Sequence, residues 1–149
     1  MPTEPSAGGN MTVYKGACHC GAVTIELETD TDPTTIDVRQ CQCSFCRAHG
    51  AESASDPAGK IRYIERRPGD INRYRFGTKT CDLILCRHCG VYMGAVMDDE
   101  NSPGFSTTQI RHFEDRALFT KSARHPDYEE EPLESRLARR RTTWTPIAG

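Results

Sequence analysis

The chain has 149 residues, a length that favours one domain over two. Its 19 Lys and Arg against 21 Asp and Glu give a formal net charge of −2, so there is no basic excess of the kind that nucleic-acid binders carry. Only 36% of the residues are hydrophobic, and no apolar run approaches the ~20 residues of a membrane-spanning helix, so we expect a thin core and no membrane partner.

The first ten residues, MPTEPSAGGN, are rich in Pro, Gly and polar side chains and predict a disordered leader over residues 1–10. They contain neither the basic segment nor the apolar segment of a secretory signal. We therefore expect a cytoplasmic protein whose thiols stay reduced, a setting in which metal binding is favoured over disulfide formation.

Short strands dominate the expected elements. Val23, Ile25 and Leu27 alternate with polar residues, which predicts a half-buried strand over Ala22–Leu27. Other strands are predicted over Ile36–Gln40, Ile61–Glu65, Ile71–Phe76, Val91–Met97 and Thr107–Phe113, with a short apolar run at Leu83–Leu85. Glu52–Lys60 is predicted as a polar loop, Asp98–Gly104 as a turn, and Ser44–His49 as one helical turn with Ser44 as its N-cap. The result is a mostly β domain over residues 11–127.

The final segment, 128–149, is a charged tail. Pro132 can begin a short helix here, since the acidic-then-basic order of YEEEPLESRLARRR suits the helix dipole. The alternatives are a helix packed on the domain and a frayed terminal segment.

Eight cysteines carry most of the chemical information. Cys18 and Cys20 form a C-x-C-G motif, and Cys86 and Cys89 form a C-x-x-C-G motif. Zinc is bound by thiolates in a tetrahedron, and a glycine after each pair lets the chain turn tightly under the metal. The two half-sites together predict a closed, structural four-cysteine zinc that compensates for the thin core.

A C-x-C-x-x-C triplet lies between them, at Cys41, Cys43 and Cys46. Three protein ligands with one position left open are the arrangement of a catalytic zinc. Arg47 follows directly, and a cation there would offset the charge of three thiolates or hold an anionic substrate group. A solvated arginine near a helix end is the alternative.

Other interpretations of the cysteines stay open at this stage. They are disulfides, two structural zincs with Cys81 or a histidine completing the triplet, and an iron–sulfur cluster. Cys81 itself is predicted to be a small buried hydrophobe. His49 is either a surface residue or a group that orients a ligand or substrate. A run of basic residues could form a rim that attracts a carboxylate-bearing thiol or a solvated sheet face: Lys60, Arg62, Arg66, Arg67, Arg73, Arg75 and Lys79.

Three motifs in this order resemble the glutathione-dependent formaldehyde-activating enzyme family, also called the centromere protein V family. They are G-A-C-H-C-G-A-V at Gly16–Val23, C-Q-C-S-F-C-R at Cys41–Arg47 and C-R-H-C-G at Cys86–Gly90. The resemblance implies a β-tent of stacked antiparallel sheets around a structural zinc. It implies that Cys18, Cys20, Cys86 and Cys89 hold this zinc, and that Cys41, Cys43 and Cys46 hold a second, catalytic zinc.

The resemblance further implies a carbon–sulfur lyase or synthase that joins glutathione and formaldehyde as S-hydroxymethylglutathione. We therefore expect a zinc-dependent enzyme with two zincs per chain, acting on a small glutathione-like thiol and an aldehyde adduct, with Arg47 beside the triplet. The alternatives are a non-catalytic, zinc-stabilised binding module and a redox or metal sensor. The oligomeric state is left open, with a homodimer among the alternatives.

Overall fold

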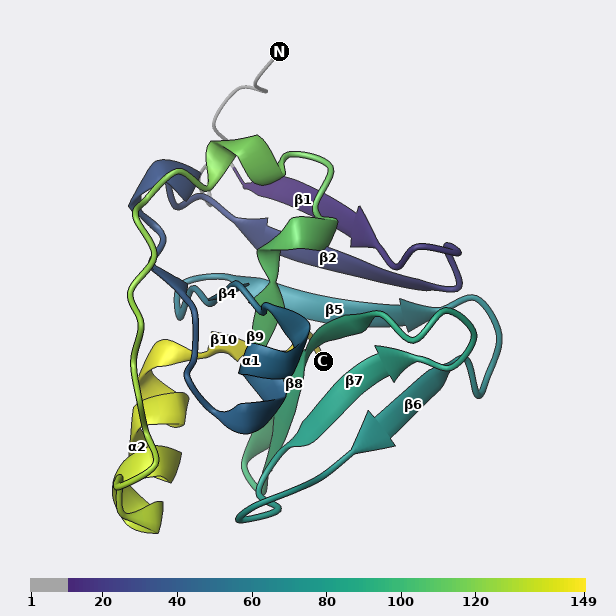
Figure 1. The fold of residues 1–149 in the computed structure, drawn as a ribbon. Coiled ribbons are helices and arrows are strands. Elements are labelled where there is room, and N and C mark those ends of the chain that lie inside the picture. The colour runs from purple at the N-terminus through teal and green to yellow at the C-terminus, as the bar shows by residue number, and fades with distance from the viewer. Residues whose placement is uncertain (1–10) are drawn as a thin grey trace.

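The computed structural model describes residues 11–149, so the leader predicted over residues 1–10 lies outside the described residues. Two antiparallel sheets make up most of the fold (Figure 1). The first sheet has the order β1-β2-β5: β1 (Thr12–Ala17), β2 (Val23–Thr29) and β5 (Lys60–Glu65). The prediction of a mostly β protein is confirmed.

The second sheet has seven strands in the order β3-β4-β9-β8-β7-β6, with β10 also paired to β9. Its strands are β3 (Val38–Arg39), β4 (Ser53–Ala54), β6 (Ile71–Tyr74), β7 (Asp82–Cys86), β8 (Tyr92–Asp99), β9 (Ser102–Gln109) and β10 (Thr145–Pro146). Two α-helices lie outside the sheets, α1 (Ser44–His49) and α2 (Leu133–Thr143), with 3-10 turns at Pro33–Thr35, Ile110–His112 and Arg116–Leu118.

The main core lies between the two sheets. Buried and partly exposed residues alternate strictly along β2, as the pattern of Val23, Ile25 and Leu27 predicts. These side chains belong to one cluster with Ile84 of β7 and Met93 of β8, so the inner faces of both sheets share one core. This burial of apolar surface is the main contribution to the stability of the fold.

A smaller core lies under the helices and joins α1 and α2 to the second sheet. It contains Cys46 of α1, Leu83, Tyr92 and Ala95 of the sheet, and Trp144 at the end of α2. The Ser55 hydroxyl donates a hydrogen bond to the carbonyl oxygen of Thr143 at 2.7 Å. The C-terminal helix predicted from Pro132 is therefore present and is fastened to the sheet at its last turn.

Three expectations about the strands are wrong. β1 is absent from the predicted strands, because Lys15 and Gly16 interrupt its apolar pattern, and β4 lies inside the segment predicted as a polar loop. The strand expected over Thr107–Phe113 runs instead over Ser102–Gln109, and a 3-10 turn follows it. A bulge between Met97 and Asp99 and a φ of +112° at Gly104 accommodate the Pro-Gly pair within the hairpin, so these residues do not end the strand.

Candidate metal centres

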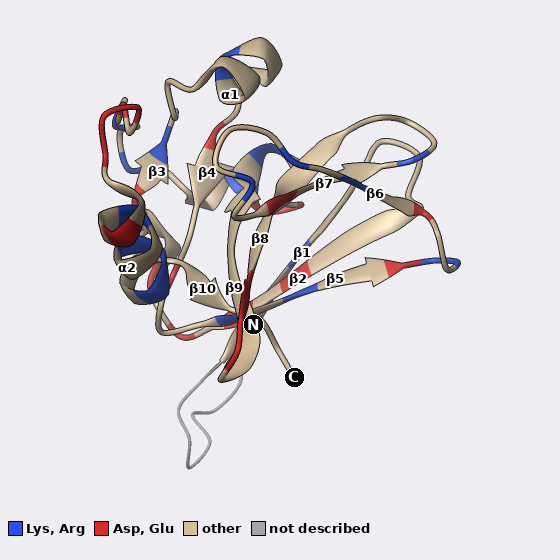
Figure 2. Ribbon diagram, turned by 90° about the horizontal axis from the view of Figure 1, so that it is seen from below, with Lys and Arg blue, Asp and Glu red and all other residues tan. Residues whose placement is uncertain are grey.

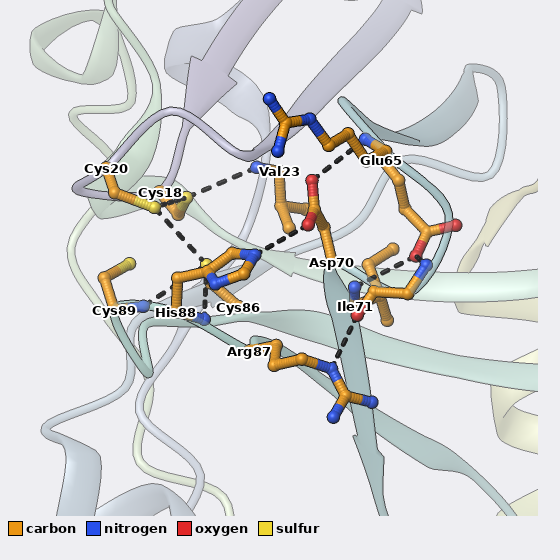
Figure 3. A network of polar contacts seen from close by, with 12 residues as sticks. Cys18, Cys20, Val23, Glu65, Asp70, Ile71, Cys86, Arg87, His88 and Cys89 are labelled. Atoms are coloured by element: carbon orange, nitrogen blue, oxygen red, sulfur yellow. Dashed lines mark hydrogen bonds and ion pairs between the residues drawn. The ribbon is translucent and has the colours of Figure 1, made fainter.

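The four-cysteine cluster (Cys18, Cys20, Cys86 and Cys89) joins the two sheets. Cys18 and Cys20 lie in the turn between β1 and β2, while Cys86 ends β7 and Cys89 lies in the turn before β8 (Figure 3). All four sulfur atoms lie within 4.8 Å of one another, and the Sγ atoms of Cys20 and Cys86 are 3.6 Å apart. The fold thus brings together Cys20 and Cys86, which are 66 positions apart in the sequence.

Backbone N–H groups point at two of these sulfurs. The N–H of Val23 donates to Sγ of Cys18 at 3.3 Å, and those of His88 and Cys89 donate to Sγ of Cys86 at 3.3 and 3.4 Å. Such donors stabilise thiolates, which are the form of cysteine that binds metal. Four thiolates in this arrangement fit a closed zinc site.

His88 lies between the two cysteines of its motif but turns to a different partner. Its Nε2 atom is 2.7 Å from Oδ1 of Asp70, as Figure 3 shows. Hydrogen bonding from His88 holds the pKa of Asp70 below its ordinary value. His88 is therefore engaged with Asp70, and the cluster is made of cysteines alone.

The three-cysteine cluster (Cys41, Cys43 and Cys46) comes from one short segment that follows β3 and runs into the first turn of α1. Its sulfur atoms also lie within 4.8 Å of one another. Cys43 is the N-cap of α1, with φ −66° and ψ 159°, and its sulfur accepts a hydrogen bond from the N–H of Cys46 at 3.4 Å. The prediction of Ser44 as the N-cap is wrong by one residue, because a cysteine sulfur takes the acceptor role that hydroxyls usually have.

Three ionised thiols this close together would repel one another. Contact with the sulfurs of Cys41 and Cys43, together with burial, raises the pKa of Cys46 far above its ordinary value. A divalent cation removes this penalty, because it favours the thiolate form of every ligand. The donor set fits zinc, with one position of the tetrahedron not filled by these three residues.

A cavity of about 610 Å³ adjoins this cluster. All three of its cysteines line the cavity, and none of the other cluster does. The wall also includes apolar side chains from the loop after β6, from β7 and from the end of α2, namely Phe76, Leu83 and Trp144. The two clusters therefore differ in access: one ties strands together and the other opens onto a pocket.

The arginines that line the cavity are not the basic residues that the sequence predicts as a rim. Arg47 lines it and is exposed, as its position after Cys46 suggested. The seven basic residues proposed as a rim do not line it, and two of them, Arg73 and Arg75, pair with Asp82. The cavity is instead lined by four further arginines: Arg39, Arg136, Arg139 and Arg140.

Two other pocket residues escaped the sequence reasoning. Tyr92 of β8 is 5% exposed, and burial raises its pKa well above the ordinary value, so a neutral phenol forms part of the wall. Cys81 was predicted to be buried but is half-buried and lines the same cavity, outside the three-cysteine cluster. Neither residue carries a local motif that marks it. His49, left open above, is exposed and packs against Phe45 with the two rings tilted by 38° and their centroids 4.5 Å apart.

All eight cysteines are free thiols. Among residues 11–149, no helix has the length and apolarity needed to cross a bilayer. Two clusters of cysteines able to hold metal, set into antiparallel sheets, define the class: a mainly β protein with cysteine-ligated metal centres.

Comparison with known proteins identifies the family within that class. The chain belongs to the glutathione-dependent formaldehyde-activating enzyme family, whose sequence profile matches residues 13–129. It is also similar to a protein of Rhodobacter sphaeroides whose crystal structure was solved as a structural genomics target, with 32% sequence identity and a TM-score of 0.54. That match covers 74% of this chain and 99% of the other.

Proposed function

We propose that the protein is a zinc-dependent carbon–sulfur lyase or synthase. It acts on a small, glutathione-like thiol and an aldehyde adduct, and it carries a structural zinc in the four-cysteine cluster and a catalytic zinc in the three-cysteine cluster. Eight free thiols suit the reducing cytoplasm, where we place the enzyme.

The observation that supports this function is the position of the three-cysteine cluster on the wall of the cavity. A cluster with three sulfur ligands and an adjoining pocket has room for a substrate atom beside the metal. The four-cysteine cluster supplies its own four sulfurs and does not line that cavity. The three-cysteine cluster is therefore suited to catalysis, and the four-cysteine cluster is suited to stabilising the fold.

The proposed reaction is the addition of a thiol to an aldehyde, or its reversal. The sulfur forms a bond to the carbonyl carbon, the C=O double bond becomes a single bond, and the proton of the thiol ends on the new hydroxyl oxygen. Bound zinc supplies a position at which a thiol loses its proton near neutral pH.

The side chains of the pocket have separate tasks in this reaction. Arg47 offers a guanidinium for an anionic group of the substrate. Tyr92 keeps its proton and can donate a hydrogen bond to the aldehyde oxygen as negative charge develops there. The apolar side chains of Phe76 and Trp144 keep water from part of the pocket, which strengthens these polar contacts.

Metal content and catalysis test the proposal together. Native mass spectrometry of protein purified without chelator should show two zinc ions per chain. A limiting amount of chelator should remove one of them before the other. Two-dimensional exchange NMR of glutathione and formaldehyde should show faster formation and breakdown of S-hydroxymethylglutathione with the intact protein. The rate should return to background once the first zinc is lost. A single, firmly held zinc together with a background rate would contradict the proposal and favour a binding module.

A further inference from the structure

Arg39 is a buried cation at the edge of the second sheet. Its side chain is 8% exposed and lines the cavity. Its Nη2 atom donates to the hydroxyls of Ser55 at 2.8 Å and Thr107 at 3.0 Å. Burial lowers the pKa of Arg39, which expresses the cost of holding its charge away from water.

Arg140 of α2 is a second buried cation on the wall of the same cavity. It is 8% exposed and lines the cavity, and its Nη1 atom donates to the hydroxyl of Thr80 at 2.8 Å. Its guanidinium lies over the ring of Trp144 at 4.9 Å from the centroid. Its Nε atom is buried without a hydrogen-bond partner among the described residues. A guanidinium has five donors in a fixed fork, so this orphan donor is unusual in a folded protein.

Three carboxylates line the cavity, those of Asp127, Glu129 and Glu131, and among the described residues none of them forms an ion pair with this arginine pair (Arg39 and Arg140). Glu131 accepts two hydrogen bonds at 3.0 Å from Arg139 and lies 3.5 Å from Nε of Arg136. Within residues 11–149, neither member of the arginine pair forms an ion pair with a carboxylate. Figure 2 shows α2, with its arginines in blue, on the same side of the molecule as β3, the strand that contains Arg39.

A buried charge without a counter-ion costs free energy, because water no longer solvates it. A ligand with a carboxylate can supply the missing partner, because guanidinium groups match carboxylates in shape and charge. We propose that the arginine pair forms an anion-binding subsite for a carboxylate of the thiol substrate, at the opposite end from its sulfur. This inference rests on the proposed function and adds a determinant of specificity to it.

The subsite depends on a segment that lies beyond the family match. That match ends at residue 129, whereas α2, which carries Arg140, begins at Leu133. The three-cysteine cluster supplies reactivity that any small thiol could use. The arginine pair would restrict the substrates to thiols that carry a carboxylate at the right distance.

The decisive measurement uses the zinc-loaded wild-type protein and two ligands without a free thiol. Isothermal titration calorimetry should show saturable binding of S-methylglutathione, and binding of its diethyl ester should be weaker by about tenfold or more, since charge-assisted hydrogen bonds are lost. Equal affinities for the acid and the ester would overturn the proposal, and so would the absence of saturable binding of the acid up to the millimolar range.

Variants locate the effect. Arg39→Gln and Arg140→Gln should each weaken binding of S-methylglutathione by about tenfold while leaving the affinity of the diester unchanged. Arg62→Gln, a control at an exposed site outside the cavity, should leave both affinities at the wild-type values. Equal affinities for S-methylglutathione in the wild type and in both pocket variants would contradict the assignment.

The melting temperatures of the two variants without ligand provide a second test of whether these arginines have a binding role or a structural one. Removal of an unneutralised buried charge should leave the melting temperature unchanged or raise it, whereas a purely structural arginine would lower it on removal. A lower melting temperature with unchanged ligand affinity in both variants would therefore overturn the proposal.

Free glutathione separates this proposal from the function on which it rests. If the thiol does not reach the metal, glutathione will bind no more tightly than S-methylglutathione, yet Arg39→Gln will still weaken both. If only the anion subsite is wrong, glutathione will bind more tightly than its S-methyl derivative, and Arg39→Gln and Arg140→Gln will leave the affinities for both unchanged.

Discussion

The two cysteine clusters use the same ligand atom in two different structural settings. The four-cysteine cluster draws its sulfurs from hairpins in separate sheets, with Cys20 and Cys86 66 positions apart. The three-cysteine cluster comes from six consecutive residues, 41–46, and borders a cavity of about 610 Å³. Closing a long loop restricts the unfolded chain most, so the first arrangement contributes stability. A short segment holds little of the fold together and leaves space for a ligand.

Substitution in the four-cysteine cluster should have the largest effect. Cys86→Ser removes a buried ligand that joins the sheets, and we expect loss of one zinc and of several kcal/mol of stability. Circular dichroism on heating, with zinc counted by mass spectrometry, measures both. Cys81→Ser is the matched control, because Cys81 belongs to neither cluster, and it should keep both zincs. Wild-type stability of the Cys86→Ser variant would contradict a structural role for the four-cysteine cluster.

Substitution in the three-cysteine cluster should separate activity from folding. Cys43→Ser removes a sulfur ligand but keeps an N-cap acceptor for α1, so we expect loss of one zinc and of catalysis with little change in melting temperature. Cys43→Ala should lose the same functions and in addition about 1 kcal/mol of stability, since the cap is lost. Exchange NMR and thermal melts measure these effects. Unfolding of the serine variant would show that this cluster is structural as well.

The smallest effect concerns Glu131, which lines the cavity but belongs to neither cluster. Hydrogen bonding from Arg139 lowers the pKa of this carboxyl, so its contribution is complete above the ordinary glutamate pKa and is lost as the pH falls through the lowered value. Glu131→Gln should destabilise the protein by about 1 kcal/mol or less at neutral pH and by nothing at strongly acidic pH. Denaturant unfolding at a series of pH values tests this. A difference that does not change with pH would mean that the ion pair contributes nothing.

The residues of both clusters could be predicted from the sequence, because cysteines that together can hold a metal ion often occur in motifs with short spacings, here C-x-C and C-x-x-C. The alternation of Val23, Ile25 and Leu27 with polar residues predicted β2 correctly, because one face of this strand is buried along its whole length. The limits of β9 could not be predicted in this way. Its Pro-Gly pair indicates a turn locally, and only pairing with β8 and β10 shows that the strand continues.

The pocket itself was largely invisible in the sequence. Arg39 lies in a strand of two residues, and Arg140 is one of three consecutive arginines, of which only this one is buried. Burial of a charged side chain depends on contacts with Ser55, Thr80 and Thr107, which are distant in the sequence. No local pattern distinguishes such an arginine from a solvated one, so only the folded chain reveals it.

The fastening of α2 and β10 to the sheet has a consequence for biosynthesis. The ribosome releases the chain from its N-terminal end, and Cys89 emerges before Leu133. The four-cysteine cluster can therefore draw the β1–β2 turn and the end of β7 together while the wall that carries Arg140 is still being made. An unfinished chain would then contain both cysteine clusters but lack Arg140, so it would have the reactive thiols before it could select among substrates.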